Sequence, residues 1–162
     1  MHCKQILKNN IRPYIVILLE IDGNKFAIPL RSNEGVAEYK IKKKAKDKII
    51  RLTKNSENKN KCIDFSKTVI MSADDYIGKK VKLLDSVQKV DIFSFKDEIE
   101  KQLKRYIHQY KKKFMLLEAG KYNKEAYYFC ATSSLLYFHQ FLGLEDPFTT
   151  IEATKDALIS SE

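Results

Sequence analysis

The stretch RPYIVILLEIDGNKFAIPLRSN, Arg12 to Asn33, decides how this chain begins to fold. Two apolar runs rich in β-branched residues flank Asp22-Gly23-Asn24, and an Asp-Gly turn between such runs is a strong signal for a β-hairpin. The second run ends in Arg31-Ser32-Asn33, while Arg12-Pro13 enters the first run at what should be the same end. We therefore expect two cations and a hydroxyl group to gather at one rim of a sheet.

The remainder of the first half has the pattern of short strands joined by local connections. Residues 48–52, 62–71 and 79–85 each combine β-branched or other apolar residues in a short run. Together with the hairpin they predict a compact, mostly antiparallel sheet or a half-open barrel.

In the second half the apolar period changes from that of a strand to that of a helix. Ser94 and Asp97 form an S-x-x-D capping pattern, and behind it apolar residues recur at intervals of three and four. This stripe predicts a helix that ends near Gly120, and it consists of Phe95, Ile99, Leu103, Tyr106, Tyr110, Phe114 and Leu117.

A second long helix is predicted over residues 123–142, closed by Gly143. It is apolar over much of its girth, so we expect it to be sandwiched between the first helix and the sheet. The polar tail, residues 149–162, is expected to fray. The prediction is one α+β domain in which residues 1–90 are mostly β with a basic loop, and residues 91–145 are helical.

Length and composition narrow the class of protein. The 162 residues favour one domain, and no apolar run approaches the roughly 20 residues of a membrane span. No apolar signal region follows Met1, so we expect a cytoplasmic protein without a membrane partner. The cysteines and histidines are scattered, which favours reduced thiols and argues against a metal site or a cofactor; they are Cys3, Cys62, Cys130, His2, His108 and His139.

The positive charge is concentrated in one part of the chain. The net charge is +9, and residues 1–70 hold 16 Lys and Arg against 7 Asp and Glu, so the whole excess lies there. Residues 40–67 alone hold 11 basic and 3 acidic side chains. Such a local excess favours a surface for a polyanion, with nucleic acid preferred over an acidic protein. A solvated, lysine-rich loop is the alternative.

The tyrosines divide into two groups. Core packing explains those on the predicted helices, which are Tyr106, Tyr110, Tyr127, Tyr128 and Tyr137. Tyr14 lies near the cationic rim and Tyr39 opens the basic segment, so both are candidates for stacking on a base. The predicted RNA-binding residues are Tyr14, Asn33, Tyr39, Lys40, Lys42, Lys43, Lys44, Lys46, Lys48 and Arg51.

The hairpin resembles the signature of the ToxN/AbiQ family of type III toxin–antitoxin endoribonucleases, in which the second strand ends in a Pro-Leu-x-Ser motif. The matching residues are Pro29-Leu30-Arg31-Ser32. The later DFSKTVIM and KQLKRYI segments lie where that family has its next strand and helix, and the short chain is most similar to the CptN branch. The resemblance implies a Kid/MazF-like barrel with added helices that cuts RNA without a metal. The ribose 2′-hydroxyl would attack the adjacent phosphate, leaving a cyclic phosphate and a 5′-hydroxyl.

The resemblance also implies partners and site residues. A small structured repeat RNA would act as the antitoxin, in a closed toxin–RNA hetero-oligomer, and the system would belong to the phage-defence type. Ser32 matches the motif serine, Arg31 takes the place of the preceding threonine, and Arg12 falls where a strand-entry lysine is found. Glu34 replaces the family's lysine two residues past the serine, so Arg31, Lys40 or Lys67 must supply that cation.

The chemistry has a basis that does not depend on the family. Cleavage builds negative charge on phosphate oxygens, which arginine or lysine stabilises, and a serine hydroxyl can orient the attacking group. The predicted catalytic residues are Ser32, Arg31, Arg12 and Lys67. Two alternatives remain. One is a non-catalytic nucleic-acid-binding module that uses the basic loop, and the other is a partner-binding protein that uses the aromatic helices.

Overall fold

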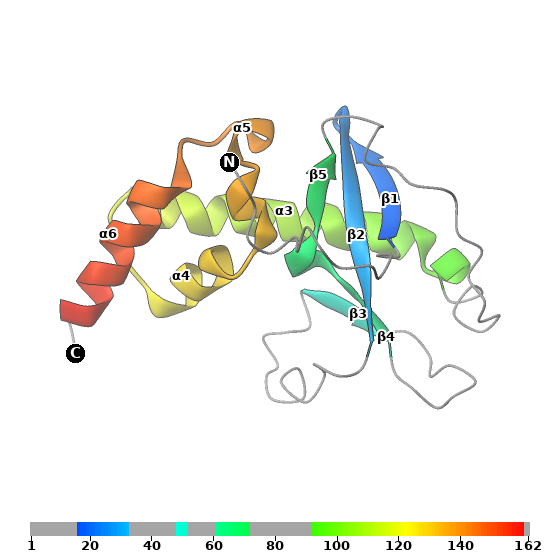
Figure 1. The fold of residues 1–162 in the computed structure, drawn as a ribbon, viewed down its shortest axis with the longest axis horizontal. Helices are drawn as coiled ribbons and strands as arrows, with labels where there is room; N and C mark the ends of the chain where they lie inside the picture. The colour runs from blue at the N-terminus through cyan, green and yellow to red at the C-terminus, as the bar shows by residue number, and fades with distance from the viewer. Residues whose placement is uncertain (1–15, 33–47, 52–60, 72–91, 161–162) are drawn as a thin grey trace, which may run out of the picture.

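The computed structural model describes residues 16–32, 48–51, 61–71 and 92–160, with the backbone only at Ser32, Arg51 and Lys61 (Figure 1). These residues form an α+β fold, with an antiparallel five-stranded sheet that is not closed and several helices. The strand predicted over residues 79–85 lies outside the described ranges. None of the helices in these ranges is long and apolar enough to cross a membrane.

The predicted hairpin is confirmed. Strand β1 spans Val16–Ile21 and β2 spans Asn24–Ser32. The strands are antiparallel: Ile21 faces Asn24 next to the turn, and Val16 faces Pro29 at the other end of the pairing. Asp22 and Gly23 form the turn with φ angles of 50° and 75°. Both angles are left-handed, which glycine adopts freely and aspartate tolerates, so the Asp-Gly sequence determines this turn.

Strand β2 changes its second partner half-way along. Its first part, Lys25–Ala27, pairs with β5 (Val69–Met71), and its last part, Leu30–Ser32, pairs with β4 (Lys61–Asp64). Strand β3 (Ile49–Arg51) pairs with the far side of β4. Pro29 lies at the changeover, where its missing N–H removes no bond to β4 or β5.

The single strand predicted over residues 62–71 is wrong, because a turn divides it. Between the pairs Leu30–Ile63 and Ala27–Val69, β2 has two residues while the facing chain has five. The three extra residues leave the ladder as the 3-10 turn η3, Phe65–Lys67. The Asp64 side chain accepts a hydrogen bond from the Ser66 N–H, which offers the backbone an alternative to continued pairing.

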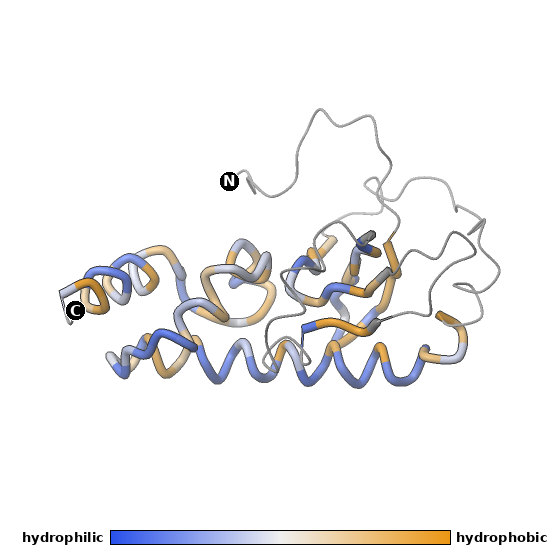
Figure 2. The backbone as a smooth tube through the Cα atoms, turned by 90° about the horizontal axis from the view of Figure 1, so that it is seen from below, coloured by the Kyte–Doolittle hydropathy of each residue, from blue (hydrophilic) through white to orange (hydrophobic). Residues whose placement is uncertain are grey.

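Helix α3, Lys96–Glu118, is the long helix of the fold, and its predicted stripe is buried from Ile99 to Leu117. Figure 2 shows its hydrophilic side facing outward and its apolar side facing the strands and the C-terminal helices. The N-cap position is occupied by Phe95, one residue after the predicted Ser94, and Phe95 makes no side-chain hydrogen bond there. The chain leaves the helix through Gly120, which has a φ of 71°.

The prediction of a second long helix is also wrong. Residues 123–142 form three short elements: α4 (Lys124–Ala131), the 3-10 turn η5 (Ser134–Tyr137) and α5 (His139–Leu142). The Ser133 side chain accepts a hydrogen bond from the Leu135 N–H and so begins a new turn. The expected sandwich is not formed either. Helix α4 packs against α3 and α6 beside the sheet, while η5 contacts β5 and η3 (Figure 1).

The tail is not frayed over residues 147–160, where it forms helix α6, Pro147–Ser160. Pro147 begins the helix, a position at which its fixed φ is favourable and its missing N–H costs nothing. Thr154 is fully buried, which ties the helix to the rest of the fold. Sheet and helices share one core, whose largest fully buried side chains are Tyr106, Tyr110, Phe26, Phe65, Phe114, Ile28, Ile63, Ile99, Leu103, Leu117 and Leu135.

Candidate functional site

Three basic residues, Arg31 on β2, Arg51 on β3 and Lys61 on β4, lie near one another at one end of the sheet. Arg31 pairs with Cys62 on β4, and Cys62 pairs on its other side with Arg51 on β3, so Arg31, Cys62 and Arg51 form a row across the sheet. Ser32 pairs with Lys61 in the adjacent row. The motif Arg31-Ser32 therefore lies at a sheet end with a basic residue on each neighbouring strand. Many predicted site residues lie outside the described ranges: Arg12, Tyr14, Asn33, Tyr39, Lys40, Lys42, Lys43, Lys44 and Lys46.

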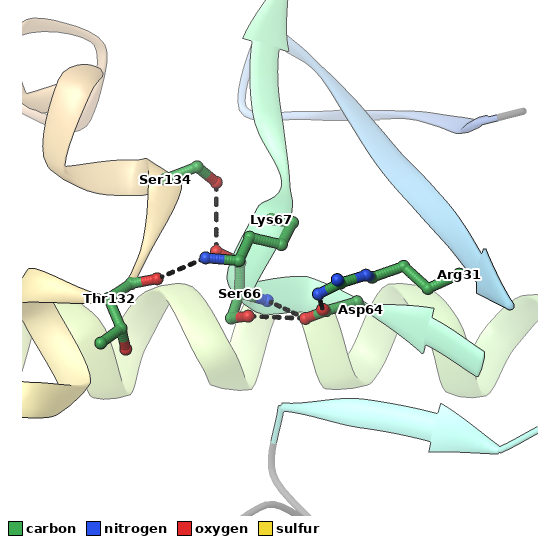
Figure 3. Close-up of polar contacts among 6 residues, drawn as sticks. All are labelled: Arg31, Asp64, Ser66, Lys67, Thr132 and Ser134. Atoms are coloured by element: carbon green, nitrogen blue, oxygen red, sulfur yellow. Dashed lines mark hydrogen bonds and ion pairs between the residues drawn. The ribbon is translucent and has the colours of Figure 1, made fainter. Parts of the chain in front are cut away.

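A buried carboxylate anchors the guanidinium group of Arg31 (Figure 3). The Asp64 side chain is fully buried, and Arg31 Nη1 lies 3.1 Å from its Oδ2. Asp64 Oδ1 accepts two more hydrogen bonds, from Ser66 N at 3.0 Å and from Ser66 Oγ at 2.6 Å. A buried charge needs such partners to offset its desolvation. The three-residue insertion that forms η3 brings them into place.

The Arg31 side chain is held at one end and remains accessible, with 43% of its surface exposed. Side chains that carry a fixed charge in partial contact with solvent can meet a phosphate without first being ordered. The sequence predicted a cation at this position, and the carboxylate that orients it comes from a strand 33 residues away in the chain.

Lys67 belongs to the same 3-10 turn and points the other way. Its Nζ donates a hydrogen bond to the backbone oxygen of Thr132 at the end of α4, at 2.9 Å. In Figure 3 Arg31 approaches the turn from β2, while the Lys67 ammonium group extends toward Thr132 on the opposite side. Ser134 holds the turn to the helices, donating to Ser66 O at 3.2 Å and also contacting Thr68 O. The structure thus brings two of the three predicted catalytic cations, Arg31 and Lys67, to opposite sides of one turn.

Lys48 adds a third cation next to η3. Its backbone oxygen accepts the Phe65 N–H at 2.8 Å, and its Nζ lies 4.5 Å from the centroid of the Phe129 ring. Burial lowers the pKa of Lys48; Asp64 opposes this shift, while repulsion from Lys67 and from Lys113 adds to it. A lysine that is partly withdrawn from water among other cations is a feature of sites that bind or process anions.

Sequence reasoning missed Lys113 and Phe129. Lys113 lies on α3 with its Nζ 5.3 Å from the Phe129 ring centroid and 3.2 Å from a carboxylate oxygen of Glu125. Both residues occur in stretches that fit ordinary helices, and Lys113 is one of three consecutive lysines. Only the crossing of α3 and α4 distinguishes Lys113 from Lys112, which is exposed.

The buried cysteines and His139 have surroundings that indicate a role in the fold and not in a reaction. Cys62 and Cys130 are buried thiols, and burial raises the pKa of Cys130 to about 12. His139 lies between Tyr110 Oη and the Glu145 backbone oxygen, each at 2.7 Å. Within the described ranges, no three His, Cys, Asp or Glu side chains form a group that could hold a metal ion.

The core interpretation of the tyrosines holds for two of them and fails for one. Tyr106 and Tyr110 are fully buried, and burial raises the pKa of both phenols. Tyr128 is 60% exposed, so core packing does not explain it.

Among the described residues, a hollow on α3 is lined by charged side chains of that helix, Asp97, Glu100, Lys101 and Lys104. The Lys104 and Glu100 charges lie 2.7 Å apart and neutralise each other. The candidate site is therefore placed around η3, where charged groups from four segments of the chain meet.

Comparison with known proteins adds no assignment: the chain matches no family model, no curated protein and no solved structure.

Proposed function

We propose that this protein is a metal-independent endoribonuclease of the ToxN/AbiQ type. The observation that carries the proposal is the state of Arg31. Its guanidinium group is fixed by the buried carboxylate of Asp64, its side chain is 43% exposed, and the residue directly precedes the motif serine, Ser32. A cation held in a fixed position suits a reaction that builds negative charge on a phosphate.

In the proposed reaction the RNA 2′-hydroxyl attacks the adjacent phosphorus, the bond to the 5′-oxygen breaks, and a cyclic phosphate and a 5′-hydroxyl are left. Arg31 stabilises the charge on the non-bridging oxygens, and Asp64 keeps the guanidinium group in place. The Ser32 hydroxyl orients the attacking group or donates to the phosphate. Arg12 supplies a further cation from the start of the hairpin.

The proposal extends to fold and partners. The open sheet, with β2 shared between two sets of partners, is compatible with a Kid/MazF-like arrangement, which we propose as the finer description. The basic segment between β2 and β3 would bind the target RNA and a structured RNA antitoxin in a closed cytoplasmic complex. Short tandem repeats in the DNA upstream of the coding sequence would support the antitoxin part of the proposal.

One observation favours a second candidate, a non-catalytic nucleic-acid-binding module. Arg31 and Lys67 both make internal contacts, with Asp64 and with the Thr132 backbone oxygen, and those contacts stabilise the fold whether or not RNA is cut. In that case the basic segment binds phosphates and the motif residues are structural.

Single-turnover cleavage of an RNA pool in excess EDTA separates the two candidates. Ser32→Ala is expected to slow cleavage by roughly a hundredfold, the scale of losing one preorganised contact in the transition state. The matched control Ser160→Ala removes the same hydroxyl from an exposed position on α6 and should cleave at the wild-type rate.

The products should carry cyclic phosphate ends, as seen by mass spectrometry. Wild-type rates for Ser32→Ala, or activity that disappears with EDTA and returns with magnesium, would contradict the mechanism. Binding of RNA without any cleavage would favour the second candidate.

A further inference from the structure

We propose that Lys48, Lys67 and Lys113 form a second phosphate-binding site beside the Phe129 ring, which holds a phosphodiester of single-stranded RNA next to the one at Arg31. The inference rests on the proposed function, since it assigns this surface to the same RNA strand.

The three lysines reach the site from three different elements. Lys48 precedes β3, Lys67 lies on η3, and Lys113 lies on α3. The ammonium groups of Lys48 and Lys113 lie 4.5 Å and 5.3 Å from the centroid of one ring, that of Phe129. Lys48 is close enough to Lys67 and to Lys113 for both charges to repel its own. The positive charges therefore converge across three segments that are far apart in the sequence.

The acidic side chains described at this place already have other partners or are open to solvent. Asp64 interacts with Lys48 but is already bonded to Arg31 and Ser66. Glu125 pairs with Lys113, and its side chain is 53% exposed, so solvent weakens that attraction. Cys130 stays a neutral thiol. A bound phosphate group would offset the repulsion that Lys67 and Lys113 exert on the partly buried Lys48.

The position of the site favours an RNA strand over a free phosphate ion. Asp64, which holds Arg31, precedes the 3-10 turn to which Lys67 belongs, so a strand that passes over this turn from Arg31 would reach Lys67 on its other side (Figure 3). Phe129 is only 7% exposed, so a ligand would contact the lysines beside the ring and not the ring face. A site of this kind contacts the backbone and adds affinity without base specificity.

The test is the binding of a single-stranded 2′-deoxy oligonucleotide to the full chain, followed by fluorescence anisotropy at several salt concentrations. This probe lacks the 2′-hydroxyl and is not cut, so binding is read separately from catalysis. Lys113→Gln should weaken binding about tenfold, as expected for a charge-assisted contact, and should lower the slope of log K against log salt by about 0.7. Lys112→Gln removes the same charge from an exposed site on the same helix and should change binding less than about twofold.

A third variant acts in the opposite direction. Glu125→Gln removes the carboxylate beside Lys113 and should tighten binding. Urea unfolding of each variant checks that the fold is kept. We expect it to be kept, because these side chains lie on helix surfaces. If Lys113→Gln behaves like Lys112→Gln in a folded protein, the second site is refuted. If inorganic phosphate binds wild-type protein tightly while the oligonucleotide does not, the assignment to RNA is refuted.

The two proposals fail separately. RNA cleavage with normal binding by Lys113→Gln would refute the second phosphate site and leave the endoribonuclease proposal intact. Weakened oligonucleotide binding by Lys113→Gln, in a protein that never cuts RNA, would support the phosphate site and refute the catalytic proposal.

Discussion

Replacing Arg31 by methionine is expected to destabilise the protein, although the side chain is 43% exposed. Methionine keeps much of the aliphatic stem but removes the hydrogen bond from Nη1 to Asp64 Oδ2, at 3.1 Å. A hydrogen bond to a charged group contributes about 1.5–3 kcal/mol. Because 43% of the Arg31 side chain is exposed, water can replace part of the interaction, and we expect the lower part of this range, about 2 kcal/mol. An ordinary surface substitution changes stability by less than about 0.5 kcal/mol.

A double-mutant cycle isolates the contact. In the Asp64→Asn background the buried charge is gone, while the amide oxygen still accepts from the Ser66 N–H. There Arg31→Met should cost only about 0.5 kcal/mol. The difference between the two backgrounds gives a coupling energy of about 1.5 kcal/mol, which is typical for residues in direct contact.

Urea unfolding followed by circular dichroism measures all four proteins, and the free energies of unfolding should be compared at equal m values. A coupling energy below about 0.5 kcal/mol would show that Asp64 does not hold Arg31. Arg31 would then not be held in a fixed position for a phosphate. The cycle also sets a condition on activity tests, because cleavage by an Arg31 variant must be measured where the variant is fully folded.

Two other predictions concern the helical part. Burial lowers the pKa of His139 in the folded protein, so as pH falls the unfolded chain protonates this imidazole before the folded protein does. The contribution of the neutral His139 to the unfolding free energy is fully present above the unfolded pKa of about 6.5. It is lost as pH falls from that value toward the lower folded pKa. His139→Gln should flatten this dependence of the unfolding free energy, and equal slopes would contradict the reasoning. Ser134→Ala removes the hydroxyl that bonds to Ser66 O and should cost about 1 kcal/mol, while Ser160→Ala should cost less than about 0.5 kcal/mol; equal losses would show that Ser134 does not hold η3 to the helices.

Local sequence determined the elements whose signals lie within a few residues. Asp22 and Gly23 adopt the left-handed turn that makes the hairpin, and the stripe from Ile99 to Leu117 is buried as its spacing predicts. Both patterns depend on the backbone's own geometry, so no distant contact is needed to interpret them. The Pro-Leu-Arg-Ser motif was placed correctly at the end of β2 for the same reason.

Only the tertiary structure decided where the strand after residue 61 breaks and where the second helical segment breaks. A three-residue insertion opposite β2 depends on the register of two strands, and no local pattern encodes register. The region of residues 123–142 is apolar nearly all round, so its period could not show that Ser133 begins a new turn there.

The same limit applies to the candidate site. The sequence showed that residues 40–67 are basic and that Arg31 and Lys67 were candidates, but it could not show that Asp64 anchors one and Thr132 the other. It also gave no reason to prefer Lys113 over its two lysine neighbours. These choices come from the packing of α3, α4 and η3 against one another, and contacts between segments far apart in the chain are fixed only when the whole core forms.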